Sequence, residues 1–377
     1  MRGGEKCLEV FCELFPEAAL FTLLHRKGSV SPVIEGMDIR TSFLQKIPGI
    51  CRHYRNFLPL FTVAIERFDL SGYDLVLSSS HCVAKGARKP DGALHICYCY
   101  TPARYAWKFF NTYFAAENPV KRRVIAYVMD RFRKWDLGSN KKVDHFLAIS
   151  DNVRKRIKEF YSRDADVIYP PVHIVPGSVR TDPGKNAGRD TVKNGQGYYL
   201  IVSAMVPYKC VDLAIKAFNR SGRRLVIIGT GSDLPGLRKS AADNVTFLGW
   251  AGEKELGDHY SGCAALVFPG EEDFGIVPVE AQSYGKPVIA YGRGGVLETV
   301  IPLREHGRRD NGESPTGVFF HEQTVEALNH AIDRFEKNRR LFKPGRLREN
   351  ALRFNRDRFK REIRDYIEAK LEIHANT

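Results

Sequence analysis

The chain alternates short apolar runs with amphipathic segments, a pattern typical of parallel α/β domains. Each apolar run ends in a polar or glycine-rich turn, after which hydrophobic residues recur at helical spacing. This alternation predicts buried parallel strands that are each followed by a helix. The expected strands cover residues 19–24, 74–79, 94–100, 143–150, 167–171, 198–204, 224–228, 245–248, 264–268, 288–291 and 316–320.

A length of 377 residues suits two domains, each large enough for its own core. The stretch 177–197 is rich in Gly, Pro, Asp, Asn and Lys, which indicates a linker. The expected organisation is a first domain at 1–176, the linker at 177–197, a second domain at 198–346 and a charged helical tail at 347–377. The expected helices cover residues 6–14, 55–66, 120–135, 154–161, 212–220, 253–260, 324–335 and 347–371, with another that starts near Pro278.

The stretch 264–299 holds the most informative chemistry. A strand ends at Phe268, a polar loop follows at 270–275, and a helix starts near Pro278. Glu272 and Glu280 lie eight positions apart across this junction. The N–H groups of the loop and of the helix start can bind an anion, and carboxylates can accept hydrogen bonds from sugar hydroxyls. A nucleotide sugar combines both features. The alternative is that both glutamates are ordinary helix-start acids that favour the helix dipole.

The spacing of Glu272 and Glu280, with the wording VPVEAQSYGKPVIAYGRGG, resembles the E-x7-E motif of retaining glycosyltransferases of the GT-B fold, family 4 (glycosyl transferases group 1). Within that family the chain is most similar to bacterial mannosyltransferases that build O-antigen and other surface polysaccharides. The likeness runs from residue 2 to about residue 300. It implies an α/β, GT-B architecture of two Rossmann-like parallel-sheet domains that face a cleft, with the acceptor on the first domain and the donor on the second.

The resemblance also implies roles for individual residues. Lys209 would neutralise the departing diphosphate, Glu272 would bind hydroxyls of the transferred sugar, and Glu280 would bind the ribose. Trp250 would border the nucleotide base, although a buried structural tryptophan is the equal alternative. The expected donor-binding positions are Gly3, Gly4, Met205, Gly229, Thr230, Trp250, Phe274, Gly275, Ile276 and Glu280.

The chain departs from the family pattern on the acceptor side. Relatives often carry a His, linked to the reacting sugar, where Tyr100 stands. The acceptor or catalytic candidates of the first domain are therefore Tyr100, His81 and Arg104. His95 is also near, but a lone His is more often a structural residue.

The turn Gly3-Gly4 opens the first expected helix. Turns of this kind normally follow a buried strand. We therefore expect that the first domain lacks its first strand and that the sequence starts downstream of the true start. A family member that tolerates the loss is the less favoured alternative, because removal of a central strand exposes both neighbouring edges.

The net charge of +14 indicates an anionic partner. Residues 121–158 hold twelve Lys or Arg against four Asp. This basic segment suggests contact with anionic lipid headgroups or a lipid-diphosphate acceptor. A helix at 120–135 that packs one apolar stripe into the core and keeps a solvated basic side is the alternative. That stripe would consist of Val124, Ile125, Val128, Met129, Phe132 and Trp135.

No metal and no cofactor beyond the nucleotide-sugar substrate are expected. Asp164-Ala165-Asp166 matches a D-x-D metal motif, but we interpret the match as chance because the family resemblance gives this stretch no metal role. The eight cysteines form no C-x-x-C pair, which favours buried, reduced thiols in a cytoplasmic protein. The basic segment 121–158 suggests that this protein is peripheral to the inner face of the plasma membrane.

The sequence thus predicts a hexosyltransferase with GDP-mannose as the leading donor and a lipid-linked or saccharide acceptor. One alternative is a GT-B nucleotide-sugar epimerase, against which the basic segment argues. The other is a non-catalytic protein that binds nucleotide sugars or nucleic acid. Nucleic-acid binding would depend strongly on salt, and the chain has no nucleic-acid motif.

Overall fold

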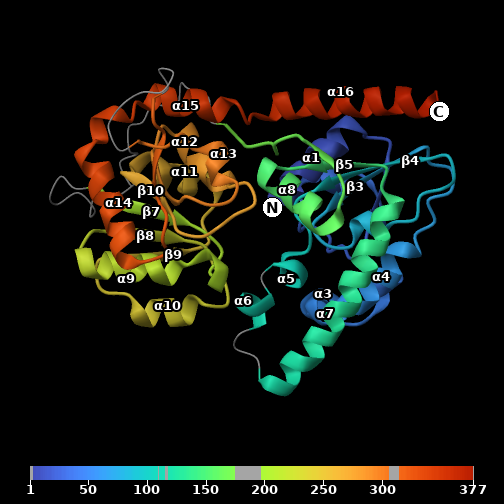
Figure 1. Cartoon of the computed structure of the whole chain (residues 1–377), viewed down its shortest axis with the longest axis horizontal. Coiled ribbons are helices and arrows are strands. Elements are labelled where there is room, and N and C mark those ends of the chain that lie inside the picture. Colours follow the sequence, from blue (N-terminus) through green and yellow to red (C-terminus); the bar gives the residue numbers. More distant parts are fainter. Residues whose placement is uncertain (1–2, 109, 115–117, 175–196, 305–313, 377) are drawn as a thin grey trace. The chain divides into compact units, whose positions relative to one another are not determined.

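The computed structural model describes residues 3–108, 110–114, 118–174, 197–304 and 314–376. They belong to two compact units: unit 1 (Met1–Pro171 with Arg356–Thr377) and unit 2 (Val172–Asn355) (Figure 1). Most of the expected linker lies outside the described residues, so the linker remains a prediction. The expectation that the first domain lacks its first strand also remains a prediction, because the described residues start at Gly3.

The described part of unit 1 contains two parallel sheets, ordered β1-β2 and β3-β4-β5-β6. Their strands are β1 (Ala19–Thr22), β2 (Asp38–Thr41), β3 (Leu75–Ser80), β4 (Leu94–Cys99), β5 (His145–Ala148) and β6 (Ala165–Val167). Strand β2 was not predicted, because it is largely exposed and has no apolar run. Strand β6 was predicted at 167–171 but begins at Ala165 and ends at Val167, before Pro170 and Pro171, which have no N–H to donate to a ladder.

Helices surround the strands of unit 1 (Figure 1). The α-helices are α1 (Gly3–Leu14), α2 (Pro32–Glu35), α3 (Ile50–His53), α4 (Leu58–Glu66), α5 (Arg104–Trp107), α6 (Phe110–Phe114), α7 (Pro119–Ser139), α8 (Asp151–Tyr161) and α16 (Arg356–Ala375). The 3-10 helices are η1 (Phe43–Lys46), η2 (Tyr54–Phe57), η3 (Ala84–Gly86) and η4 (Asn140–Lys142). The predicted cap of α8 is confirmed, because the Ser150 hydroxyl accepts a hydrogen bond from the N–H of Val153.

The described part of unit 2 contains a six-stranded parallel sheet in the order β12-β11-β10-β7-β8-β9. Its strands are β7 (Tyr199–Val202), β8 (Leu225–Ile228), β9 (Val245–Gly249), β10 (Ala265–Phe268), β11 (Val288–Tyr291) and β12 (Gly317–Phe320). The apolar residues of these strands alternate between two cores. Ile201, Ile227 and Val267 belong to one core, while Leu200, Val226 and Leu266 belong to the other. A sheet buried on both faces explains why these strands are continuous apolar runs in the sequence.

The helices of unit 2 cover both faces of this sheet (Figure 1). They are η5 (Pro207–Lys209), α9 (Val211–Ser221), α10 (Leu234–Ser240), α11 (Glu253–Gly262), α12 (Ile276–Ser283), α13 (Val296–Thr299), α14 (Val325–Lys337), η6 (Arg339–Leu341) and α15 (Pro344–Leu352).

The charged tail forms two helices where one was predicted. Helix α15 packs against α12 in unit 2, whereas α16 belongs to unit 1 and packs against α1. Phe359 of α16 contacts the rings of Phe11 on α1 and Tyr98 on β4. The tail therefore contributes to the cores of both units.

None of the described helices is long and apolar enough to cross a membrane.

Candidate active site

The sheet of unit 2 places four loops at the carboxyl ends of its central strands. Strand β7 lies between β8, which follows it in the chain, and β10, which comes later, so the strand order reverses at β7. In open parallel sheets, ligands bind at the carboxyl ends of the strands at such a reversal. The loops after β7 and β10 are therefore the expected floor of a site, and they carry Lys209 and Glu272 respectively.

Glycines hold these loops in backbone contact. A Cβ on Gly229 would lie 1.9 Å from the carbonyl oxygen of Ser203, and Gly229 also has a φ of +136°. A Cβ on Gly231 would lie 2.2 Å from the carbonyl oxygen of Met205. The N–H of Met205 donates to the Thr230 carbonyl at 2.9 Å. The loops after β7 and β8 thus touch through main-chain atoms, which places Met205, Gly229 and Thr230 together, as the donor-site prediction requires.

The loop after β10 is fixed in the same way. The N–H of Gly295 donates to the carbonyl of Glu272 at 2.8 Å, and a Cβ on Gly295 would lie 2.3 Å from the carbonyl oxygen of Asp273. On the other side, a Cβ on Gly270 would lie 2.8 Å from the carbonyl oxygen of Tyr208. The backbone around Glu272 is therefore held by its neighbours on both sides.

Lys209 and Glu272 form an ion pair between the ends of β7 and β10. Both side chains are largely buried. The Lys209 ammonium also lies 5.2 Å from the centre of the Tyr208 ring. The two residues predicted to be catalytic therefore meet, although they are separated by more than sixty positions in the sequence. A phosphate that entered here would compete with the Glu272 carboxylate for the ammonium.

Glu280 lies in α12 and accepts a hydrogen bond from the hydroxyl of Tyr260 at 3.0 Å. Tyr260 is buried and stacks on the ring of Tyr284, with centroids 5.2 Å apart. Burial, and then the Glu280 charge, raise the pKa of Tyr260 well above its ordinary value. Tyr260 therefore remains a neutral donor that orients the Glu280 carboxylate. The sequence argument did not single out Tyr260, because a buried Tyr in a helix carries no distinctive signal.

A glycine turn precedes α12, and the anion-binding role of this turn stays a prediction. Gly275 precedes the helix with a φ of +91°, a conformation that favours glycine. Phe274 is buried against the ring of Phe354. Ile276 is the first helical residue, so the helix begins two positions before Pro278. This turn aims the N–H groups of the first helical residues along the axis of α12.

Trp250 follows Gly249 at the end of β9 and is 80% exposed. The alternative of a buried structural tryptophan is therefore wrong. An exposed indole on a loop of unit 2 remains available to stack on a flat ring, and the role at the nucleotide base stays a prediction.

The candidates of unit 1 are the donor-site glycines Gly3 and Gly4 and the acceptor candidates Tyr100, His81 and Arg104. Gly3 and Gly4 lie in the first turn of α1 itself, whereas the sequence placed them in a turn ahead of the helix. The Tyr100 hydroxyl donates to the Gly4 carbonyl at 3.0 Å and lies 2.8 Å from the Ser79 hydroxyl. Tyr100 thus joins the end of β4 to the start of α1. His81 is exposed after β3, and Arg104 opens α5.

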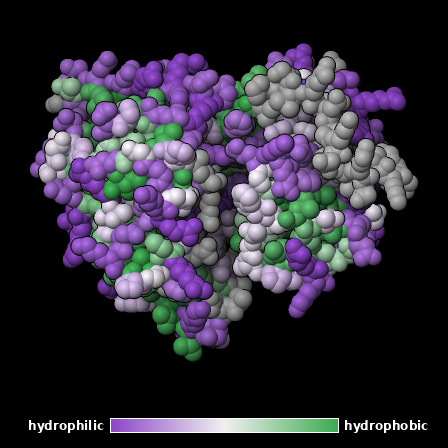
Figure 2. Space-filling view, turned by 180° about the vertical axis from the view of Figure 1, so that it is seen from behind, coloured by the Kyte–Doolittle hydropathy of each residue, from purple (hydrophilic) through white to green (hydrophobic). Residues whose placement is uncertain are grey.

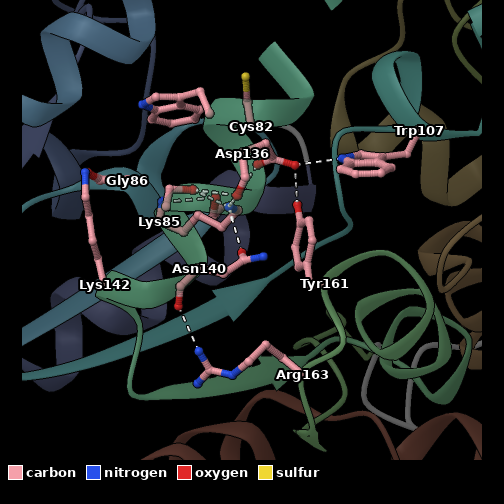
Figure 3. Close-up of polar contacts among 12 residues, drawn as sticks. Cys82, Lys85, Gly86, Trp107, Asp136, Asn140, Lys142, Tyr161 and Arg163 are labelled. Carbon is pink, nitrogen blue, oxygen red and sulfur yellow. Dashed lines mark hydrogen bonds and ion pairs between the residues drawn. The ribbon is translucent and has the colours of Figure 1, made fainter. Parts of the chain in front are cut away.

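A buried polar network lies behind these candidates, and sequence reasoning missed it (Figure 3). The buried ammonium of Lys85 contacts Asp136 Oδ1 at 2.9 Å and Asn140 Oδ1 at 3.0 Å. Asp136 Oδ2 accepts hydrogen bonds from Trp107 Nε1 at 2.7 Å and from the Tyr161 hydroxyl at 2.8 Å. The network joins η3, α5, α7 and α8. Its members come from four separate segments, so no spacing in the sequence could reveal it.

His95 is a structural residue. One ring nitrogen lies 2.8 Å from the Ser78 hydroxyl and the other 2.8 Å from the Lys142 carbonyl. Burial lowers the pKa of His95 to about 4, so its imidazole is neutral near pH 7.

Neither aspartate of the D-x-D match is arranged for a metal. Asp164 pairs with Lys158, and Asp166 accepts a hydrogen bond from Tyr366. Across the described ranges, no three His, Cys, Asp or Glu side chains are grouped as a metal site.

Comparison with known proteins decides the class. Residues 185–354 match the family described as "Glycosyl transferases group 1", which covers most of unit 2. The chain is a glycosyltransferase. It is 24% identical over 367 residues to the "Alpha-1,3/1,6-mannosyltransferase ALG2" of Kluyveromyces lactis, covering 84% of this chain and 70% of the relative.

A second relative matches over a shorter stretch. The chain is 33% identical over 172 residues to the "GDP-mannose-dependent alpha-(1-6)-phosphatidylinositol monomannoside mannosyltransferase" of Mycobacterium tuberculosis, covering 40% of this chain and 45% of that protein. Among solved structures, the "lipopolysaccharide outer core galactosyltransferase WaaB apo form" superposes with a TM-score of 0.66 at 17% identity, covering 98% of this chain and 96% of the other. The GT-B fold of this glycosyltransferase is thereby confirmed.

Proposed function

We propose that this glycosyltransferase is a retaining family 4 enzyme that transfers mannose from GDP-mannose to a lipid-linked or saccharide acceptor in surface polysaccharide or O-antigen biosynthesis. The two curated relatives described above are both mannosyltransferases, and the name of the mycobacterial one specifies GDP-mannose. The proposal extends those properties to this chain. It also places the enzyme in the cytoplasm, peripheral to an anionic membrane that its basic segment 121–158 contacts.

One observation carries the proposal: Lys209 and Glu272 form an ion pair at the strand reversal of unit 2. In the proposed mechanism the donor diphosphate replaces Glu272 as the partner of Lys209. The ammonium then opposes the negative charge that grows on the leaving diphosphate, which is where fixed positive charge lowers the barrier most. Glu272, released from the pair, accepts hydrogen bonds from hydroxyls of the transferred sugar.

Glu280 has a separate part in the proposal. Tyr260 already holds one of its carboxylate oxygens, so the carboxylate is oriented before any ligand arrives. A vicinal diol, such as the ribose of a nucleotide, donates two hydrogen bonds and suits such a carboxylate. The proposed function needs no metal ion, because Lys209 supplies the charge at the diphosphate. Addition of EDTA should therefore leave the rate of transfer unchanged.

Thermal stabilisation by a panel of GDP and UDP sugars tests the donor site. A ligand at a hundred times its Kd adds about 2.7 kcal/mol to the free energy of unfolding, a readily measured shift in Tm. GDP-mannose should stabilise the wild type, and Lys209→Ala and Glu280→Ala should abolish the shift. Lys216→Ala is the matched control, since Lys216 is an exposed lysine paired with Asp212 elsewhere in unit 2. A panel in which no nucleotide sugar stabilises the folded protein would refute the donor site.

A product assay tests the reaction itself. Lys209→Ala should lower kcat by roughly a hundredfold to a thousandfold, the cost of removing one group that stabilises transition-state charge. NMR of the product should show the anomeric configuration of the donor. An inverted product would contradict the retaining mechanism, and release of an epimerised nucleotide sugar without transfer would contradict the proposed reaction.

A further inference from the structure

Helix α7 has two apolar faces where the sequence predicted one. Met129 and Phe132 are buried, and Ile125 and Val128 pack against the same core of unit 1. Val124 was expected to join this stripe, but it is 59% exposed and points the other way. The predicted single stripe is therefore wrong at Val124.

The second face is an outward stripe, formed by Val120, Val124 and Tyr127. These residues are 74%, 59% and 63% exposed. They lie four and three positions apart, so they share one side of the helix. Single exposed apolar residues are ordinary on protein surfaces. Three in register on one half of a helix are not, and Figure 2 shows hydrophobic surface at the projecting end of α7, next to hydrophilic surface.

The helix is well formed up to this end. The Asn118 side chain caps it by accepting a hydrogen bond from the N–H of Lys121, and Pro119 occupies the first turn. Helix α6 is joined to it by a hydrogen bond of 2.8 Å from Arg122 to Asn111. The outward stripe is thus presented by an ordered helix.

The opposite end of α7 is held firmly. Asp136 and Ser139 belong to the network around Lys85, and Arg133 donates to the Ala106 carbonyl at 2.6 Å. The most extensive contacts of α7 are with α5, η4, α4 and η3 (Figure 1). The held end of α7 packs against α5, the helix that carries the candidate Arg104.

The charge around the outward stripe is mainly positive. Residues 119–134 hold six Lys or Arg and one Asp. Arg123 and Arg131 are exposed and lie three or four positions from members of the stripe, whereas Lys134 pairs with Asp130. Further along the basic segment, Lys142, Lys155 and Lys158 pair with Glu66, Asp151 and Asp164 respectively. Residues 119–134 therefore carry a net positive charge beside the outward stripe.

We propose that the outward stripe of α7 inserts into the headgroup region of an anionic lipid bilayer, while the surrounding Arg and Lys side chains bind lipid phosphates. An apolar stripe flanked by cations is the pattern by which a helix lies in a membrane interface. The inference deepens the membrane contact of the proposed function by assigning it to one face of one helix. The biological purpose of this lipid binding rests on the proposed function. The binding itself does not, since it requires no sugar substrate.

Flotation of the full chain with lipid vesicles tests the inference. Wild type should bind vesicles of phosphatidylcholine with phosphatidylglycerol, and bind pure phosphatidylcholine much more weakly. The triple variant Val120→Ser/Val124→Ser/Tyr127→Ser should lose about tenfold in partitioning or more. Arg123→Gln/Arg131→Gln should lose roughly fivefold per charge at low salt. Tyr127→Trp should bind, and its fluorescence should be quenched by lipids brominated in the acyl chain.

Two matched control variants test whether the loss of vesicle binding is specific to the outward stripe and its cations. Leu352→Ser/Ile373→Ser removes exposed apolar residues elsewhere, and Lys155→Gln/Lys158→Gln removes paired cations of the same segment; both should bind vesicles as wild type does. Wild-type binding by the triple variant, or no preference of the wild type for anionic vesicles, would overturn the inference. The GDP-mannose thermal shift, measured on each variant, should be unchanged. Loss of vesicle binding by the triple variant with an unchanged GDP-mannose thermal shift would support the inference. Vesicle binding by a wild type that GDP-mannose does not stabilise would refute GDP-mannose as the donor but not the lipid-binding surface.

Discussion

Unit 2 and unit 1 build their candidate sites from different kinds of contact. In unit 2 the loops around Lys209 and Glu272 are joined by main-chain contacts that only glycines permit. In unit 1 the helices behind Tyr100 and Arg104 are joined by side chains, with the Lys85 and Asp136 pair at the centre. The arrangement in unit 2 requires glycines, which have no side chain, whereas the arrangement in unit 1 requires charged side chains.

The difference predicts different sensitivities. A main-chain junction is insensitive to pH and intolerant of any added carbon atom. A buried ionic network tolerates changes in shape poorly as well, but it also responds to charge and to acid. The tryptophans separate the two units experimentally, because Trp107 and Trp135 are partly buried in unit 1 whereas Trp250 of unit 2 is already exposed.

The largest effect is expected at the centre of the unit 1 network. Asp136→Asn leaves the buried Lys85 ammonium without its counter-charge, which should lower the free energy of unfolding by about 4 kcal/mol. Urea unfolding followed by tryptophan fluorescence measures this. Asp130→Asn is the control on the same helix, because its pair with Lys134 is exposed and should be worth less than about 0.5 kcal/mol. Equal losses of unfolding free energy in the two variants would mean that the buried network does not stabilise unit 1.

Acid should weaken unit 1 next. Burial holds the pKa of His95 at about 4, below its ordinary 6.5, so between these values the unfolded chain binds more protons than the folded one. Stability is therefore complete above pH 6.5 and falls as the pH drops towards 4, by about 3 kcal/mol for this one group. Half-buried His145 has a lowered pKa as well and adds in the same direction. Unfolding midpoints at pH 7 and pH 4.5 measure the loss, and His95→Gln should reduce the dependence. A wild type that is equally stable at both pH values would rule this out.

The main-chain junction of unit 2 should be tested at Gly229. Gly229→Ala places a carbon against the Ser203 carbonyl and strains a positive φ, which together should cost about 2 to 3 kcal/mol. Circular dichroism during thermal unfolding suits this measurement, because Trp250 reports little. Gly236→Ala is the control, since nothing lies within 4 Å of its Cβ position in α10, and it should gain up to about 1 kcal/mol. If Gly229→Ala is as stable as Gly236→Ala, the contact between these loops is not structural.

The smallest effect sharpens the comparison inside unit 2. Tyr260→Phe removes the hydrogen bond to Glu280 and should cost about 1 kcal/mol of stability and a few-fold in affinity for GDP-mannose. Tyr198→Phe is matched, because it also loses a tyrosine hydrogen bond, to the His259 carbonyl at 2.9 Å, but this bond does not involve Glu280. Calorimetry should show the affinity loss in Tyr260→Phe alone. The same loss in Tyr198→Phe would mean that Tyr260 acts through general stability.

The same contrast explains what the sequence could predict. The strands of unit 2 are buried on both faces, so they appear as continuous apolar runs, and nearly all were placed correctly. The glycines and the two glutamates form a local motif because one strand–loop–helix junction carries them. That Lys209 meets Glu272 follows from the strand order rather than from any spacing, so only the structure brought them together.

Unit 1 was less predictable for physical reasons. Exposed β2 has no apolar run, and β6 ends before the prolines that the sequence prediction had included in it. The network of Lys85, Asp136, Trp107 and Tyr161 joins segments far apart in the chain. The two faces of α7 could not be separated from the sequence, because Val124 and Ile125 are adjacent and both apolar, and only the packing partners decide which one is buried.

The ends of unit 2 have a consequence for the architecture of the gene product. The N–H of Val172 donates to the Phe354 carbonyl at 2.9 Å, and Val172 forms a parallel bridge with Asn355. The chain thus enters and leaves unit 2 at neighbouring points, so residues 172–355 are a cassette inserted into unit 1. Such a cassette can be excised or exchanged for another nucleotide-sugar module with its two ends already in place. A stop codon after residue 355 would spare the cassette and instead remove α16, whose Arg356 binds Glu9 of α1.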